Sequence, residues 1–343
     1  MQPSDTWRAP RLRVLAGGVV LPGVTEASVI ASGGFAADFF RVRAAAGGDA
    51  QAVLAQPVLP VDVQVALGPL GAFVSLVQGN ADAVGLDPVA GVLTIEGRDH
   101  AALLIEARTQ ETFANQTASE IAAQLAARHG LIPDVQPTTT PVGRYWELEH
   151  DSLTLAAGAR ATTEWDLLAM LAGWEGFDLW VSGATLHFRP PDMLAVPPVL
   201  SAVPTLAGPP DFSALRLDRA LSFAGDIVVT VKSWHSRLGS ATTQAATRAR
   251  GAGQAQEYAF VVPNLSPEAA SLLAGRRLAE IASHELLLRG EMPGELSLSP
   301  RMAFQLMGTG TMFDTLWRID EIERRISMRE GFAQSVVARA AGA

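Results

Sequence analysis

The sequence has no cysteine and only one lysine, Lys232. Without cysteine the chain has no disulfide, no thiol nucleophile, no iron–sulfur cluster and no cysteine-ligated zinc. A Walker A loop needs a Gly-Lys pair to hold phosphates, and Lys232 instead follows Thr230-Val231 in a strand-like segment. These absences exclude several large classes of enzyme and nucleotide-binding protein.

Positive charge and long apolar runs are scarce as well. The chain has 26 basic and 35 acidic residues, for a formal net charge of −9. An acidic chain does not attract phosphates, so sequence-specific or packaging-type nucleic-acid binding is disfavoured. No uninterrupted apolar run reaches about 18 residues, so we expect no membrane-spanning segment. The start, Met1 to Asp5, has no basic segment followed by an apolar one, so we expect no signal peptide and synthesis in the cytoplasm.

The chain nevertheless has the composition of a folded protein. Its 343 residues are 48% hydrophobic and 18% charged, which allows a sizeable core and two or three domains. It contains 31 glycines and 21 prolines but only 6% aromatic residues. This composition predicts many turns and short elements rather than one long helical bundle.

Residues 1–107 have the pattern of a β domain. Residues 61–67 place Val61, Val63, Val65 and Leu67 on alternate positions, the period of a strand with one buried face. Residues 40–43 alternate in the same way, and further short apolar runs occupy 24–30, 73–77 and 92–95. Several short strands separated by glycine pairs predict a sandwich or a small barrel.

Residues 108–190 change to a helical period. Thr117 and Glu120 have the spacing of a capping box, and the helix that follows is expected to stop at Gly130. A second helix is expected to start near Thr163 and to end at Gly176. A hairpin over 177–188 completes a small α/β module.

A proline-rich segment follows this module. Residues 189–210 contain seven of the 21 prolines. Proline cannot donate a ladder hydrogen bond, so such a segment is stiff, extended and excluded from the centre of a sheet. We assign 191–210 as a linker.

Residues 211–343 return to a β pattern with one long helix. Ser266-Pro267-Glu268 has the N-cap, first-turn proline and early acid of a helix start, which predicts a helix over 266–288. The apolar phase slips between Ile319 and Ile322, which indicates a β-bulge. Residues 239–256 are rich in Gly, Ala, Thr and Gln and are predicted to form a polar low-complexity loop; whether a partner orders it stays open. Other strands are expected at 227–232, 296–298, 303–307, 316–328 and 332–338.

No motif predicts a catalytic centre. Gly308-Thr309-Gly310 lacks the third glycine of a dinucleotide site. His284-Glu285 lacks the second histidine of a zinc protease, because Leu288 stands four residues later. His150-Asp151-Ser152 contains the three residue types of a catalytic triad side by side. This adjacency predicts no triad, because triads are assembled from distant segments.

Single residues carry no stronger signal. His100 beside Asp99 is interpreted as a turn or first-turn histidine rather than a general base. Trp165, Trp174 and Trp180 are spaced as core residues rather than as a sugar-binding platform. We therefore assign no catalytic, cofactor-binding or metal-binding residue and expect a binding or structural role without enzymatic activity.

Two segments resemble a known family. Gly97–Leu104 and Glu111–Ile121 are similar to the late control D family of phage tail proteins, which resemble baseplate hub proteins and the N-terminal hub part of VgrG proteins. Leu168–Ala172, Trp180–Phe188 and Trp317–Asp320 extend the resemblance in order along the chain. It covers essentially the whole sequence and is most specific from 97 to 188.

The resemblance implies an α+β, mainly β fold, in which two tail-tube-like β-barrel domains, 1–107 and 211–343, are separated by the insertion module. It also implies that three chains form a ring of approximate six-fold symmetry, which adapts the six-fold tail tube to the three-fold spike and lets DNA pass. The implied partners are two further copies, a tail tube or distal tail protein, a spike or tail-tip protein, and the tape measure protein. The implied location is the tail baseplate or tip of the virion, after synthesis in the host bacterial cytoplasm.

Several alternatives stay open. A cell-wall hydrolase of a tail tip would release fragments from peptidoglycan, and a host-glycan-binding module would be a monomer. The net acidic charge leads to the hypothesis of an acidic lumen, which would repel phosphates and let a duplex slide. These residues do not distinguish a contractile tail from a non-contractile one, or a phage from a domesticated injection device.

Overall fold

The computed structural model describes residues 9–341 with internal gaps. The gaps are residues 49, 69, 110, 112, 114–115, 140, 143, 146–149, 152–162, 193–195, 206–207, 236–239, 252–253 and 263–264. Ser152 of the adjacent His-Asp-Ser residues and Asn115 of the family-like segment therefore lie outside the described residues. Within the described residues, no helix has both the length and the apolar character needed to cross a bilayer.

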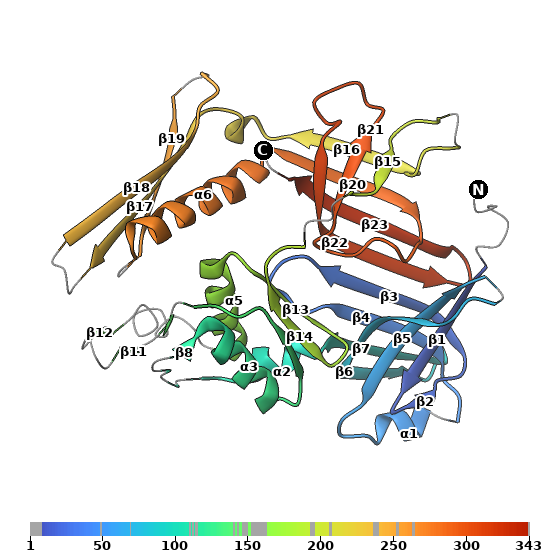
Figure 1. Cartoon of the computed structure of the whole chain (residues 1–343). Coiled ribbons are helices and arrows are strands. Elements are labelled where there is room, and N and C mark those ends of the chain that lie inside the picture. Colours follow the sequence, from blue (N-terminus) through green and yellow to red (C-terminus); the bar gives the residue numbers. More distant parts are fainter. Residues whose placement is uncertain are drawn as a thin grey trace.

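The first β unit covers residues 10–99 and is antiparallel throughout (Figure 1). The predicted alternation is confirmed over 61–65, because Val61, Val63 and Val65 are buried and Asp62 and Gln64 are not. It is wrong at the end of the strand, where Ala66 is buried and Leu67 only half-buried. The strands follow the order β3-β4-β7-β6-β5-β1-β2. The elements are β1 (Pro10–Ala16), β2 (Val19–Val20), β3 (Val24–Ser32), β4 (Phe39–Ala45), α1 (Ala50–Leu54), β5 (Pro60–Leu67), β6 (Val74–Asp87) and β7 (Val92–Asp99).

The insertion module follows β7 and has its own hydrophobic core. The predicted capping box of Thr117 with Glu120 is present, and the second helix starts as predicted at Thr163, which forms a capping box with Asp166. Gly176 ends the second helix with a φ of 70°, a conformation that glycine adopts without strain. The elements are α2 (Ala101–Glu106), β8 (Gln116–Thr117), α3 (Ala118–Arg128), β9 (Ile132–Val135), β10 (Pro141–Val142), β11 (Arg144–Tyr145), β12 (His150–Asp151), α5 (Glu164–Glu175), β13 (Asp178–Ser182) and β14 (Thr185–Arg189).

The second β unit has the strand order β16-β20-β23-β22, with β21 paired to β22. The predicted bulge is confirmed by a register shift between Ile319 and Glu321. The prediction of a strand at 296–298 is wrong, since this segment forms a loop between β20 and β21. The elements are β15 (Val199–Ser201), β16 (Ala214–Arg219), η3 (Leu221–Phe223), β20 (Leu286–Pro293), β21 (Ala303–Met307), β22 (Leu316–Ser327) and β23 (Gly331–Ala340).

The proline-rich linker takes part in this sheet. Its short strand β15 pairs in parallel with β21 and makes no other ladder among the described strands. A proline-rich segment tolerates an edge position, because an edge strand forms a hydrogen-bond ladder with a neighbour on one side only.

The two β units share one sheet. β22 pairs with β3 over seven residues, from Glu321 opposite Ser32 to Ser327 opposite Glu26. The result is a single 13-stranded sheet that runs through both units (Figure 1). The angle between the units is therefore set by a ladder of backbone hydrogen bonds.

A separate substructure, here called the arm, projects from the second β unit (Figure 1). It consists of β17 (Ile227–His235), β18 (Ser240–Arg248), β19 (Gln256–Val261) and α6 (Pro267–Ser283). The three strands form their own sheet in the order β18-β17-β19, and α6 packs on β17 and β18. β17, β18 and β19, expected to lie in the second barrel, thus lie outside the 13-stranded sheet.

Two predictions for this region are wrong. Residues 240–248, predicted as part of a loop, form β18 and pair with β17 along nine residues. Their threonines are β-branched and fit a strand, although small side chains hide the alternation. The helix predicted over 266–288 ends at Ser283, and Leu286 begins β20. The apolar residues 286–288 continue a helical pattern but form a strand, in which Leu286 and Leu288 are buried.

At Gly33 the backbones of the two units approach closely. Its N–H donates to the carbonyl of Asp320 at 2.5 Å, and a Cβ there would lie 2.7 Å from the carbonyl oxygen of Ile319. We expect Gly33→Ala to reduce the free energy of unfolding by about 1–3 kcal/mol, because the backbones must separate. Gly34→Ala is the matched control, since the nearest atom would lie 3.7 Å away. Urea unfolding measures both, and equal stability of the two variants would contradict this tight contact.

Candidate functional site

The residues singled out in the sequence lie apart from one another. His100 precedes α2 and its Nδ1 lies 2.8 Å from the carbonyl of Gly183. His284 follows α6 and contacts Phe223, with ring centroids 5.7 Å apart. Lys232 lies in β17 and is exposed. Gly308–Gly310 form a loop in which Asp314 accepts hydrogen bonds from Thr309 and Gly310. Within the described residues, no group of three or more His, Asp and Glu side chains could hold a metal ion.

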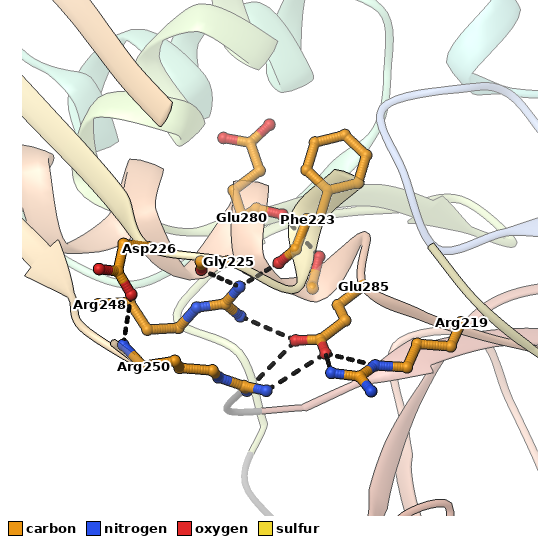
Figure 2. Close-up of polar contacts among 9 residues, drawn as sticks. Arg219, Phe223, Gly225, Asp226, Arg248, Arg250, Glu280 and Glu285 are labelled. Atoms are coloured by element: carbon orange, nitrogen blue, oxygen red, sulfur yellow. Dashed lines mark hydrogen bonds and ion pairs between the residues drawn. The ribbon is translucent and has the colours of Figure 1, made fainter. Parts of the chain in front are cut away.

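Glu285, the acid that follows His284, differs from these residues because it is fully buried among arginines. Its carboxylate contacts three guanidinium groups, at 2.8 Å from Arg219 and 3.2 Å from both Arg248 and Arg250 (Figure 2). Arg248 also donates to the carbonyls of Phe223 and Gly225. These partners come from β16, the end of β18 and the segment after it. Glu285 therefore fixes the arm to the second β unit, and it is a structural residue rather than a zinc-site remnant.

A polar interior lies where the first β unit, the insertion module and the second β unit meet, here called the junction. A cavity of about 500 Å³ opens there. Its wall includes residues from β6, from β13 and from the loop 296–302. The charged residues that line it are Asp38, Asp99, Asp178, Arg189, Asp192, Arg301 and Arg324.

Arg301 connects all three parts. It donates from Nη2 to the carbonyl of Ser32 at 2.6 Å, and its guanidinium lies 4.8 Å from the ring of Trp180. Burial lowers the pKa of Arg301 to about 10, so it is charged at neutral pH. Its φ of 74° is the one positive value found for a non-glycine residue in the described part of the chain. Such a conformation costs free energy, which the contacts of the side chain offset.

Two further contacts join the insertion module to the β units. Asp178 at the start of β13 accepts two hydrogen bonds from Arg318 of β22, both at 2.7 Å. Trp165 of α5 donates from its indole N–H to the carbonyl of Phe35 at 3.0 Å. The insertion module is thereby bound to both β units by charged and polar groups that are partly or fully buried.

Asp38 and Asp99 are the titratable pair of the junction. Burial raises the pKa of Asp38 to about 6, and hydrogen bonding from Ser32 and the charge of Arg301 offset this only in part. Burial, and next the charge of Asp38, raise the pKa of Asp99 to about 8. At neutral pH the pair therefore holds one proton, chiefly on Asp99.

The sequence alone did not identify the residues that join the three parts of the chain at the junction. Arg301, Arg318 and Asp178 are separated by more than a hundred positions from their partners, and no local motif predicts these contacts. Trp180, interpreted as a core residue, is only half-buried and lines the cavity, where it stacks on His187 at 4.4 Å. Trp165 is buried in the core of the insertion module, as predicted.

The 13-stranded sheet also has a charged outer face that crosses both β units. Directly paired residues lie on the same face of an antiparallel sheet. Arg41 pairs with Glu96 at 2.6 Å in the first unit, and Arg289 with Asp218 at 3.2 Å in the second. Ion pairs on this face join two sets of residues: Arg41, Arg43, Arg216, Arg289 and Arg325, with Glu26, Glu96, Asp218, Glu291 and Glu323. The exposed Glu321, which alternates with Glu323 along β22, lies on the same face.

Comparisons of the sequence identify no relative. No protein-family model matches the chain, and no curated protein matches it.

Comparison of the fold does find similar structures along the whole chain. A tail protein from Neisseria meningitidis superposes with a TM-score of 0.73 at 14% identity, covering 97% of each chain. A 43 kDa tail protein of prophage MuSo2 from Shewanella oneidensis gives 0.66 at 16% identity, covering 96% of this chain and 98% of the other. An E. coli type VI secretion component, described as structurally similar to phage T4 tail proteins, gives 0.55 at 11% identity, covering 96% and 77%. The chain thus has the mainly β, α+β fold of phage tail and secretion-system tail proteins.

Proposed function

We propose that this chain is a structural hub subunit of a phage tail or a related injection machine. The observation that carries the proposal is the single sheet shared by two β units within one chain. The similarity to tail proteins along 97% of the chain supports it. In this proposal the two units are tail-tube-like domains, and the protein acts by shape rather than by catalysis.

Symmetry then gives the mechanism. Three copies, each with two similar units, present six units to a six-fold tube and three chains to a three-fold spike. Such an adaptor must be rigid, because loose units would not keep the six positions equivalent. The shared sheet and the buried polar contacts of the junction supply this rigidity.

The partners follow from the same geometry. The ring would contact a tail tube or distal tail protein on one side and a spike or tail-tip protein on the other, with the tape measure protein as a further partner. DNA would pass through the lumen, and the complex would lie at the tail baseplate or tip of the virion. We assign the charged outer face of the shared sheet to the lumen. Its arginines are largely paired with acids, so in this proposal the lumen offers phosphates few free cations, in line with the hypothesis of an acidic lumen.

The assembled mass tests the oligomeric state. We expect native mass spectrometry of the purified chain, alone or with tube and spike proteins, to give about 108 kDa for the hub, from three chains of 36.1 kDa. The physical reason is that head-to-tail contacts between chains that close into a ring leave no interface free. A particle that stays at one chain mass at micromolar concentration, with its tube and spike partners present, would contradict the ring.

A further inference from the structure

The carboxyl groups of Asp38 and Asp99 lie on the first β unit, on neighbouring segments. The backbone N–H of Asp99 donates to the carbonyl of Asp38 at 2.9 Å. Asp99 is 5% exposed, and both residues line the junction cavity. Burial disfavours the charged form of both carboxyl groups, and the charge of Asp38 further disfavours ionisation of Asp99.

The other two parts of the chain cover this pair. The loop 296–302 of the second β unit brings Arg301 toward both carboxyl groups, and β22 brings Arg324 toward Asp38. β13 of the insertion module contributes Asp178, which is paired with Arg318. The other charged or titratable neighbours are Arg189 and Asp192 of the cavity wall and His100, which is next to Asp99 in sequence.

We propose that Asp38 and Asp99 form a proton-sensitive latch, which holds the second β unit and the insertion module against the first unit more firmly as the pH falls. The inference concerns a single chain and is independent of the ring.

The direction follows from linkage. In the closed junction the two carboxyl groups bind protons more tightly than ordinary aspartates, with pKa values of about 6 and about 8 against 3.8. In an open junction water reaches both groups, and they return to ordinary values. Protons therefore favour the closed form, and opening at pH 6–8 releases the proton of Asp99. Each rise of one pH unit in that range should make opening about tenfold easier.

Hydrogen–deuterium exchange measures this opening directly. The N–H of Gly33 donates to Asp320 across the two units, so a peptide containing Gly33 reports it. After correction for the intrinsic exchange rate, we expect protection of that peptide to rise about tenfold per unit from pH 8 to pH 6. A peptide from β5, inside the first unit, should keep constant protection. Native mass measured at each pH separates this opening from any change in chain association.

Variants decide whether the pair is responsible. Asp99→Asn should remove most of the pH dependence and leave only the smaller contribution of Asp38 near pH 6. Asp38→Asn should weaken the dependence at the acidic end if the first variant does not fold. Asp192→Asn is the matched control, because Asp192 lines the same cavity but is exposed. Protection that is independent of pH in the natural chain, or an unchanged slope in Asp99→Asn, would overturn the latch whether or not the chain forms a ring.

Discussion

Glu285→Ala should lower the free energy of unfolding by about 3–5 kcal/mol, the cost of breaking a buried ion pair by removing one partner. Glu285 is fully buried, and its carboxylate is the shared partner of Arg219, Arg248 and Arg250. Without it, three guanidinium groups face one another with little water to screen them. Burial and the charge of Arg250 already lower the pKa of Arg248, which shows how unfavourable this environment is for a cation.

The arm should respond before the rest of the chain. Because the cluster connects β18 and the segment after it to β16, its loss should increase hydrogen exchange in β17, β18 and β19 and leave β3 unchanged. Urea unfolding followed by circular dichroism gives the global value. Glu280→Ala is the control, since Glu280 is an exposed acid of α6 paired with Arg277 and should cost less than about 0.5 kcal/mol. A Glu285 variant as stable as this control would contradict the assigned role.

Arg301→Ala should destabilise the chain by about 3 kcal/mol, in the range for removal of one partner of a buried charge pair. The substitution removes the hydrogen bond to Ser32, the contact with Trp180 and the positive charge that faces Asp38. It keeps the unfavourable backbone conformation, because alanine also has a Cβ.

Arg301→Gly separates the side chain from the backbone. At a φ of 74° glycine is unstrained, so this variant should be about 0.5–1 kcal/mol more stable than Arg301→Ala, even though glycine raises the entropy of the unfolded chain. Thermal and urea unfolding of both variants measure the difference. Arg189→Ala controls for removal of an exposed arginine from the same cavity and should cost less than about 0.5 kcal/mol. Equal loss in Arg189→Ala and Arg301→Ala would exclude a special role for Arg301.

Local signals in the sequence predicted local structure well. Both capping boxes depend on residues three positions apart, and the bulge in β22 depends on a phase slip within four residues. The alternation of side chains in β5 similarly follows from the burial of one face of that strand. Each of these features follows from neighbours along the chain, which a single sequence displays.

Other features depend on distant partners and could not be read in this way. β18 has small and hydroxyl side chains without apolar alternation, and it is a strand because β17 pairs with it and α6 covers one face. The pairing of β22 with β3 joins residues about 290 positions apart. The junction site depends on Arg301 meeting Ser32 and Trp180, and no local pattern in the sequence shows that these three residues meet.

The ladder between β3 and β22 has a consequence for any attempt to divide this protein. Cutting the chain into two half-proteins would leave seven residues of unpaired backbone on each half, an open strand border of the kind that promotes aggregation. Each half would then be insoluble or would reunite with its counterpart. A gene encoding this chain can accordingly tolerate changes in the arm or the insertion module far more readily than a break between its two sheet-forming halves.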